Sequence, residues 1–332
     1  MKNYKNILIV RTDRIGDVIL TTPAVEVLRK NFPHAKISMI VAAATRDLVE
    51  GNPYLNEVIM DDRKGVHRGM LGFWRLARLL RQRKFDLAVV FHTKRRTNAF
   101  CFLAGIPDRI GYHNNKWGFL LTKRIKDVRP LGEKHESEYC LNVLRFLGIE
   151  NGRGQMSLPL EKGAELWAED FFRQCHFEPV ERIVAIHLGA SGPEKRWPVE
   201  RFAETMNSLQ EKYPCQFVLI GAADIQVLAL DMKPLLKVPS HDLTGQTSVS
   251  QLASLLKRCH LLISNDSGPV HVAAAVGTPV VSIFTRNQPG INWERWRPLS
   301  SNAKVVSVSP GSSDPIAVSD VLEAVDALFK LC

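Results

Sequence analysis

Three short segments of the chain combine acidic, basic, hydroxyl and glycine residues in orders that could do chemistry. The first follows the apolar run at residues 7–10 and reads Arg-Thr-Asp-Arg-Ile-Gly-Asp from Arg11 to Asp17. A carboxylate there can take the proton of an attacking hydroxyl, which makes Asp17 a candidate general base. The competing interpretation is that Asp17 only caps a helix, because aspartate is a favoured N-cap residue.

The second segment, at residues 187–198, reads His-Leu-Gly-Ala-Ser-Gly-Pro-Glu-Lys-Arg-Trp-Pro. Its glycines permit close approach of the backbone, Ser191 offers a hydroxyl group and Lys195 offers a positive charge. Such groups ahead of a helix N-terminus are what a phosphate needs. The alternative is an ordinary loop between a strand and a helix, with Lys195 in solvent.

The third segment begins at Ser264 and reads Ser-Asn-Asp-Ser-Gly-Pro-Val-His, followed by Val-Ala-Ala-Ala-Val-Gly-Thr-Pro. Asp266, Ser267 and Gly268 stand between a predicted strand and a helix of small residues, whose first N–H groups can meet an anion. His271 lies three residues after Gly268 and faces the same end of the helix. An N-cap role for Asp266 and a core role for His271 are the competing interpretations. The order of residues in this segment favours a ligand site.

Other common sites are excluded by the sequence. The chain contains neither the G-x-G-x-x-G fingerprint of dinucleotide-binding proteins nor the G-x-x-x-x-G-K-[ST] loop of nucleotide triphosphatases. Its six cysteines are scattered and form no C-x-x-C pair, which argues against a disulfide framework and a zinc site. No Asp-x-Asp pair stands at a strand end, and the one close acidic pair after a strand, Asp61-Asp62, lies in the first half. We therefore expect no metal and no cofactor.

Alternating strands and helices surround these segments and predict α/β domains with parallel sheets. Strand patterns and helix patterns alternate in both halves of the chain. Residues 151–159, rich in Gly and Pro, are predicted to be the linker between the two halves. The predicted strands are residues 7–10, 37–41, 57–60, 87–91, 182–187, 216–220, 260–264, 280–284 and 304–309. The predicted helices are residues 17–31, 72–82, 199–212, 249–258, 269–276 and 319–331. In such sheets ligands bind beyond the carboxyl ends of the strands, where all three segments fall.

The charge of the chain is concentrated in its first half. Residues 1–150 hold 27 Lys and Arg against 15 Asp and Glu, whereas residues 151–332 hold 17 against 19. This asymmetry indicates an anionic partner for the first half, either an acidic lipid or glycolipid or a nucleic acid, unless the basic surface is merely solvated. The basic residues are not interleaved with aromatic ones, which argues against nucleic acid.

The same composition bears on location. No apolar run reaches the ~20 residues of a membrane span, and the apolar run near the start is too short for a signal peptide. We therefore expect a cytoplasmic protein, peripheral to a membrane; the family resemblance described next implies contact with the inner membrane surface.

Taken together, the motifs resemble those of glycosyltransferase family 9, the ADP-heptose:lipopolysaccharide heptosyltransferases. The resemblance rests on Gly16-Asp17, Lys195-x-Trp197-Pro198 and Asp266-Ser-Gly-x-x-His271-x-Ala-Ala-Ala. Subsidiary matches are Arg109-Ile-Gly-Tyr112, His135-Glu136 and Leu243-Thr-Gly245 followed by Thr247-Ser248. The resemblance spans essentially the whole chain.

This resemblance implies a GT-B fold, in which two Rossmann-like domains turn their parallel sheets toward a central cleft. Residues 1–155 would bind the acceptor and residues 156–315 the nucleotide sugar, and a helix within residues 316–332 would pack back toward the first domain. The implied reaction moves a heptose from ADP-heptose to a hydroxyl of the lipopolysaccharide inner core, with inversion at the anomeric carbon and without a metal. An anionic core would suit the basic first half.

The resemblance also implies roles for individual residues. Asp17 would be the general base, while Asp266 and His271 would orient the donor sugar. The groups expected around the leaving diphosphate are Ser191, Lys195, Ser267 and Gly268. Asp224 and Thr247 would contact the nucleotide. The basic residues expected to bind the acceptor follow two strands and are Arg63, Lys64, Lys94, Arg95 and Arg96.

The chain departs from the family pattern at two places. The family often has two adjacent hydroxyl residues where this chain has Ala190-Ser191, and a glutamate where it has Gly221-Ala-Ala-Asp224. Two other functions compete with the one that the resemblance implies. One alternative function is a nucleotide-sugar-binding protein without catalysis, which the joint retention of Asp17 and the donor motifs disfavours. The other is a sugar-nucleotide epimerase with the GT-B architecture, which the lack of a further set of acidic residues disfavours.

Overall fold

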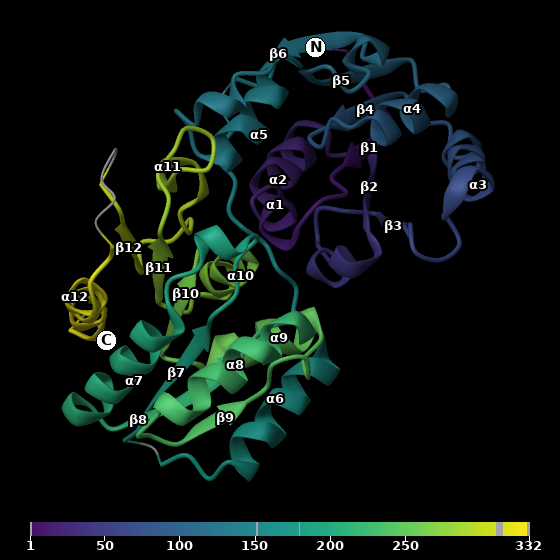
Figure 1. Ribbon diagram of the computed structural model, residues 1–332. Coiled ribbons are helices and arrows are strands. Elements are labelled where there is room, and N and C mark those ends of the chain that lie inside the picture. Colours follow the sequence, from purple (N-terminus) through teal and green to yellow (C-terminus); the bar gives the residue numbers. More distant parts are fainter. Residues whose placement is uncertain (1, 151, 179, 310–314, 331–332) are drawn as a thin grey trace. The chain divides into compact units, whose positions relative to one another are not determined.

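The protein is described by a computed structural model that covers residues 2–150, 152–178, 180–309 and 315–330 (Figure 1). The chain divides into two compact units between Pro159 and Leu160, at the end of the predicted linker. No helix in the described ranges is long and apolar enough to cross a membrane.

The first unit is built on a six-stranded parallel sheet in the order β3-β2-β1-β4-β5-β6. Its strands are β1 (Asn6–Val10), β2 (Lys36–Ala42), β3 (Glu57–Asp61), β4 (Leu87–Val90), β5 (Asp108–His113) and β6 (Lys123–Lys126). The central strands are apolar along their length because both faces of the sheet are covered, and Ile7 to Val10 are fully buried.

Five α-helices accompany this sheet: α1 (Ile15–Ile19), α2 (Thr22–Asn31), α3 (Gly69–Gln82), α4 (Arg95–Leu103) and α5 (Glu136–Arg145). The sequence predicted one helix over residues 17–31, and the structure breaks it in two. The Thr21 hydroxyl donates to the Asp17 carbonyl (2.8 Å) and the Thr22 hydroxyl to the Ile19 carbonyl (2.7 Å). Pro23 has no N–H to continue the ladder, so the chain restarts as a second helix.

The second unit repeats the arrangement with the strand order β12-β11-β10-β7-β8-β9, again all parallel. Its strands are β7 (Arg182–His187), β8 (Cys215–Ile220), β9 (Ser240–Asp242), β10 (Leu261–Asn265), β11 (Val280–Phe284) and β12 (Ala303–Ser307). Its α-helices are α6 (Lys162–Gln174), α7 (Val199–Lys212), α8 (Gln226–Met232), α9 (Val249–Arg258), α10 (Gly268–Val276), α11 (Trp293–Trp296) and α12 (Val318–Phe329). The predicted α/β class is confirmed.

Both sheets reverse the direction of strand addition at one central pair of strands. In the first unit this pair is β1 and β4, and in the second it is β7 and β10. Loops on either side of such a pair diverge and leave room for a ligand at the carboxyl ends of the strands. The three segments singled out by the sequence follow β1, β7 and β10, so each lies at such a point.

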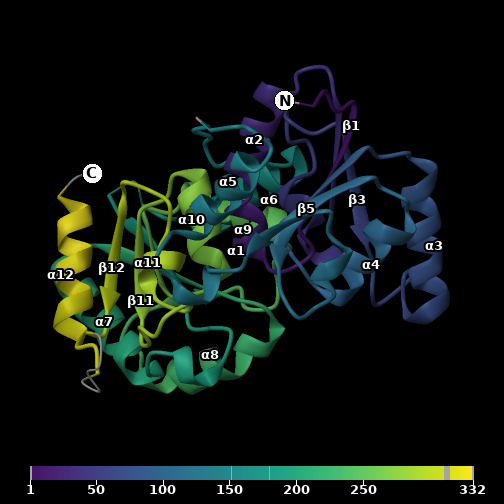
Figure 2. The same ribbon diagram turned by 90° about the horizontal axis from the view of Figure 1, so that it is seen from above.

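The C-terminal helix belongs to the core of the second unit. Helix α12 lies against α7, β11 and β12 (Figure 2). Val321, Val325 and Leu328 repeat at helical spacing and are buried in the core of that unit. This apolar stripe anchors α12 in the second unit. The expectation that the C-terminal helix also packs back toward the first domain stays a prediction.

An ion-pair cluster around the buried carboxylate of Asp61 fixes the loop that follows β3. The Asp61 carboxylate at the end of β3 accepts hydrogen bonds from Arg96 at 2.7 and 2.9 Å and from Arg63 at 2.8 Å. Arg96 also donates to the carbonyl of His67 (3.0 Å). Burial opposes ionisation of Asp61, but the two arginines outweigh it and lower its pKa. The cluster therefore joins β3, α4 and the loop before α3.

Replacing Leu328→Ala tests whether α12 belongs to the second core. We expect a loss of about 2–5 kcal/mol in the free energy of unfolding, because a buried leucine leaves a cavity. Urea unfolding followed by circular dichroism measures this loss. The matched control is Leu230→Ala on α8, where the side chain is 64% exposed and the expected change is within about 0.5 kcal/mol. Equal effects at the two positions would contradict the packing of α12.

Replacing Asp61→Asn tests the ion-pair cluster. The variant leaves two arginines facing a neutral amide, and we expect a loss of about 3 kcal/mol at neutral pH. The folded-state pKa of Asp61 is lowered, so its contribution is present above the unfolded value of about 3.9 and disappears as the pH falls through the folded value. Unfolding measured across this range should show a gap between wild type and variant that closes in acid. A gap that stays constant would show that the Asp61 charge contributes nothing.

Candidate active site

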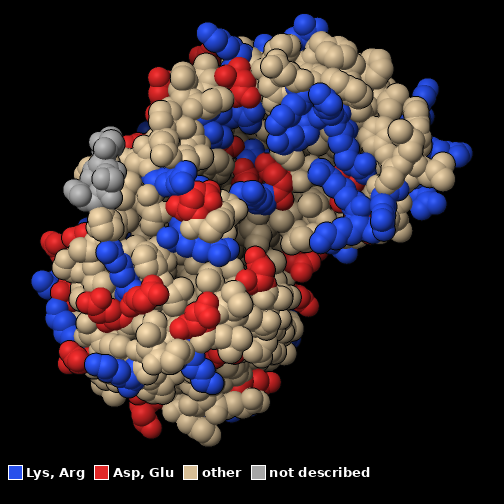
Figure 3. Space-filling view, in the orientation of Figure 1, with Lys and Arg blue, Asp and Glu red and all other residues tan. Residues whose placement is uncertain are grey.

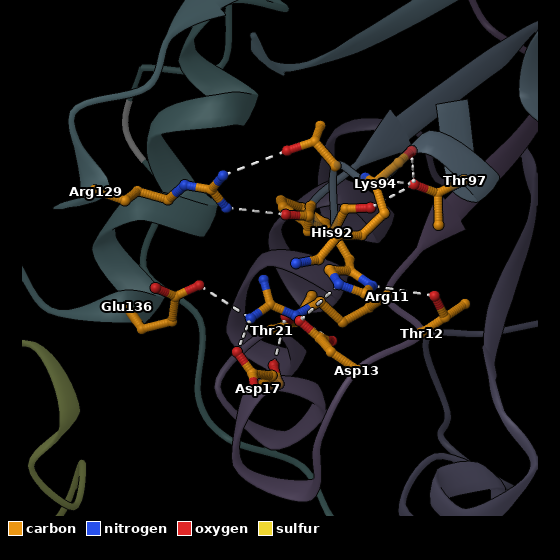
Figure 4. Close-up of polar contacts among 12 residues, drawn as sticks. Arg11, Thr12, Asp13, Asp17, Thr21, His92, Lys94, Thr97, Arg129 and Glu136 are labelled. Carbon is orange, nitrogen blue, oxygen red and sulfur yellow. Dashed lines mark hydrogen bonds and ion pairs between the residues drawn. The ribbon is translucent and has the colours of Figure 1, made fainter. Parts of the chain in front are cut away.

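The residues at the centre of the first sheet surround one buried arginine (Figure 4). Arg11 directly follows β1, and its side chain is 2% exposed. Its Nε lies 3.0 Å from an oxygen of Asp13, and one terminal nitrogen contacts both Asp17 and, at 3.0 Å, Glu136. Three carboxylates therefore share one guanidinium group.

The elements around Arg11 explain this arrangement. Asp17 is the third residue of α1, whose N-cap is Arg14, so Asp17 does not cap the helix as the competing interpretation held. Glu136 is the first residue of α5. The His135 side chain caps that helix by accepting from the N–H of Ser137, which holds Glu136 at the end facing Arg11. Sequence reasoning identified Asp17 but gave no role to Arg11 or Glu136.

The environment of Asp17 makes its carboxylate unusually basic. Burial is the largest influence on its pKa and raises it, Arg11 lowers it, and the nearby charges of Asp13 and Glu136 raise it again. The net result is a raised pKa, and the pKa of Asp13 is raised in the same way, first by burial. A single guanidinium cannot fully stabilise three buried negative charges. Asp17 is therefore well suited to accept a proton.

A neutral histidine lies beside this cluster. His92 follows β4, and its pKa is lowered to about 3 by burial and by the charges of Arg11 and Lys94. Its Nδ1 lies 3.1 Å from the hydroxyl of Thr12, which also accepts a hydrogen bond from Arg63 at 2.9 Å. The loops after β1, β3 and β4 are thus tied together at the edge that carries Asp17.

The five basic residues predicted to bind the acceptor lie at this same edge but differ in their surroundings. Arg63 and Arg96 are engaged by Asp61, whereas the side chains of Lys64, Lys94 and Arg95 are exposed. Lys94 faces a lysine that the sequence prediction had not included, Lys116. The proximity of Lys116 is the largest cause of the lowered pKa of Lys94. Such a pair of like charges gains from an anion.

The predicted donor residues of the second unit also come together. Lys195 and Asp266, which are 71 positions apart, form an ion pair with 2.8 Å between Nζ and Oδ2. Both side chains are largely buried, and they line a small pocket with Phe284, Thr285 and Arg286. Arg286 was missed by the sequence prediction, although it stands two residues after the end of β11.

Hydrogen bonds tie the loops after β7 and β10 together. The Asn265 side chain accepts from the N–H of Trp197 (2.9 Å) and donates to the carbonyl of Leu188 (2.7 Å). The Ser267 hydroxyl lies 3.1 Å from Nδ1 of His187, whose pKa burial lowers to about 4. These bonds fix the loop that carries Lys195 to the loop that carries Asp266.

The start of α10 lies next to this ion pair. Ser267 is the N-cap and Gly268 the first helical residue, and the Ser267 side chain makes no capping hydrogen bond to the helix. His271 is buried in the following turn. Ser191 is exposed in the loop after β7. The N–H groups at the start of α10 and the Ser191 hydroxyl are thus carried by the two loops at the centre of the sheet.

Asp224 and Thr247 lie farther along the same sheet edge. Their loops follow β8 and β9 and are joined by a hydrogen bond from the N–H of Gly245 to the carbonyl of Gly221 (2.7 Å). Asp224 is exposed and Thr247 is partly exposed. Every predicted donor residue therefore belongs to one edge of the second sheet.

Among the residues that the structure describes, no group of three or more His, Cys, Asp or Glu side chains is placed to hold a metal ion. Metal independence itself stays a prediction.

Comparison with known proteins gives consistent similarities. Lipopolysaccharide heptosyltransferase 2 of Escherichia coli K12 is 27% identical over 328 residues, which cover 92% of this chain and 88% of that protein. The crystal structure of the glycosyl transferase family 9 from Veillonella parvula DSM 2008 is 26% identical with a TM-score of 0.90, covering 100% of this chain and 99% of that one. The structure of E. coli ADP-heptose lps heptosyltransferase II is 23% identical with a TM-score of 0.80, covering 98% and 99%.

The likeness to the E. coli structure concerns the fold and confirms the predicted GT-B class, with two Rossmann-like domains. Residues 73–322 match the family model described as glycosyltransferase family 9 (heptosyltransferase). This match extends over most of the chain and includes the Lys195 and Asp266 motifs. The chain belongs to glycosyltransferase family 9 and is a glycosyltransferase.

Proposed function

We propose that this glycosyltransferase moves a heptose from ADP-heptose to a hydroxyl of the lipopolysaccharide inner core, with inversion at the anomeric carbon. The names of two similar proteins, a lipopolysaccharide heptosyltransferase and an ADP-heptose lps heptosyltransferase, support the donor and the acceptor class. The observation that carries the mechanism is Asp17, a largely buried carboxylate of raised pKa at the strand-reversal point of the first sheet.

In the chemical step, Asp17 takes the proton of the acceptor hydroxyl as its oxygen attacks C1 of the donor sugar. The new C–O bond forms on the face opposite the departing ADP, and the electron pair of the broken bond leaves with the diphosphate. A carboxylate of ordinary pKa is a weak base for a hydroxyl, so the burial that raises the pKa of Asp17 favours proton transfer.

The leaving diphosphate gains negative charge as the bond breaks. The Lys195 ammonium can donate one hydrogen bond to Asp266, as in the structure, and use its other protons on phosphate oxygens. Arg286 lines the same pocket and adds a second positive charge. The Ser191 hydroxyl and the N–H groups of Ser267 and Gly268 would complete the site, since a helix N-terminus stabilises an anion.

Other residues of the second unit would bind the rest of the donor. Asp266 lies at the phosphate pocket, and we assign Asp266 and His271 to orienting the hydroxyl groups of the donor sugar. Asp224 and Thr247 lie toward β8 and β9, so they are assigned to the nucleoside. This order along the edge would place sugar, diphosphate and nucleoside in sequence from β10 toward β9.

The acceptor would bind at the Asp17 edge of the first unit, on the cytoplasmic face of the inner membrane. Lys64, Lys94 and Arg95 are exposed there and can pair with phosphates or carboxylates of the core. Arg63 and Arg96 are engaged by Asp61, so we assign them mainly to holding the loop and only in part to the acceptor.

The variant Asp17→Asn tests the general base. We expect turnover to fall by roughly 10²–10⁴-fold, because the amide cannot accept the proton, while ADP affinity stays unchanged. A mass-spectrometric transfer assay with ADP-heptose and a core acceptor measures the first quantity, and calorimetry with ADP the second. The matched control is Asp47→Asn, an exposed aspartate of the same unit. Turnover within a few-fold of wild type would remove Asp17 from the chemistry.

The variant Lys195→Ala tests the diphosphate site. A charge-assisted hydrogen bond is worth about 1.5–3 kcal/mol, so ADP binding should weaken about 10-fold or more. Calorimetry measures the affinity, and Lys237→Ala, an exposed lysine of the same unit, is the control. Unchanged ADP affinity in the Lys195 variant would contradict the placement of the diphosphate.

A further inference from the structure

Helix α3 presents large apolar side chains to solvent. Met70, Leu71 and Trp74 are 72%, 85% and 52% exposed, and Val66 in the preceding loop is 57% exposed. The opposite face of the helix, with Leu76 and Leu80, is buried in the core beside α4. The exposed apolar residues therefore contribute little to the stability of the first unit. A cluster of this kind usually marks an interaction surface.

The charge around this apolar cluster has one sign. Residues 63–84 contain eight Lys and Arg and neither Asp nor Glu. Exposed arginines continue the outer face of α3 beyond its apolar first turns, at positions Arg75, Arg78 and Arg81. Lys and Arg side chains are prominent over the part of the first unit that carries α3 and α4 (Figure 3). A partner of this surface must be both apolar and anionic.

The surface is held in place by the fold. Nδ1 of His67 accepts from the N–H of Asp62 (3.1 Å), and Arg96 donates to the His67 carbonyl (3.0 Å). The loop lies so close to α3 that a Cβ on Gly72 would come within 2.4 Å of the His67 carbonyl carbon. The Trp74 ring stands edge-on to Phe73. The apolar side chains are thus displayed on a rigid support.

We propose that α3 and the loop before it are the membrane-docking surface of this protein, which binds a bilayer rich in anionic lipid. Val66, Met70, Leu71 and Trp74 enter the boundary between headgroups and acyl chains, and the arginines pair with lipid phosphates. A helix of 14 residues is too short to span the membrane but suits a position along its surface. A tryptophan at such a boundary is typical of membrane-bound proteins.

This location deepens the proposed function. The loop before α3 follows β3, so the N-terminal end of α3 lies at the same sheet edge as Asp17. A protein docked by this end would bring its general base toward an acceptor embedded in the same membrane. The docking itself does not require transfer, so it can be tested separately.

The experiment measures sedimentation of the full chain with vesicles of phosphatidylcholine alone or mixed with phosphatidylglycerol. One variant combines Met70→Ser, Leu71→Ser and Trp74→Ser, and a second combines Arg75→Gln, Arg78→Gln and Arg81→Gln. We expect the wild type to bind the anionic vesicles, the first variant to bind about 10-fold or more weakly and the second roughly 100-fold more weakly. The control, Val227→Ser with Leu230→Ser, changes equally exposed apolar residues on α8 and should bind like wild type.

Three results would overturn the proposal. The first is that the wild type does not sediment with anionic vesicles, and the second is that the variants sediment as well as the wild type does. The third is that gel filtration shows a monomer for the apolar variant and a dimer for the wild type, which would assign the surface to a second copy. Urea unfolding followed by circular dichroism shows whether the variants remain folded. Transfer to an acceptor without acyl chains should be unchanged, so a missing transfer activity would contradict the proposed function and leave the docking result standing.

Discussion

The guanidinium of Arg11 is the interaction on which the first unit depends. A buried arginine without partners would be very costly, so the fold must bring carboxylates to it from α1 and α5 as well as from its own loop. Burial raises the pKa of Asp17, and the neighbouring charges of Asp13 and Glu136 raise it further because all three carboxylates share the one guanidinium. The same contacts that join strand, loop and two helices therefore also create a basic carboxylate, so stability and reactivity have a common origin here.

The second unit has a sheet of the same kind but a different arrangement of charges. In the proposed function its groups attract an anionic diphosphate, and a lysine alone in a partly buried pocket would lack a partner. The Lys195–Asp266 pair balances that charge and fixes the direction of the ammonium. Asn265 joins the two loops through backbone groups, so the pair does not depend on flexible surface contacts. One unit thus gathers three carboxylates around Arg11 at its strand-reversal point, and the other holds Lys195 in a fixed position beside Asp266.

The sequence was informative wherever the signal is local. Continuous apolar runs predicted the buried strands, and the order Asp266-Ser-Gly marked the end of β10 correctly. The pairing of Glu136 with Arg11 could not be predicted, because the residues are 125 positions apart and no periodicity connects them. The break between α1 and α2 depends on threonine hydroxyls that bond to carbonyls, and the position of α12 depends on a core that only the folded sheet creates. Arg286 could have been found, since a charged residue just beyond an apolar strand is the same signal that identified Asp266.

The excess positive charge of the first half now divides into groups with different physical roles. Arg63 and Arg96 are held by Asp61, and Arg83 binds Glu57, so these arginines stabilise the fold. Lys94 and Lys116 face each other at the Asp17 edge and gain most from an anion bound between them. The arginines of α3 lie beside exposed apolar side chains, a combination that a soluble anionic sugar does not satisfy but a lipid surface does. Net charge alone favours an anionic partner, whereas the neighbours of each basic residue separate the structural ion pairs from the residues that we propose for acceptor binding and for membrane docking.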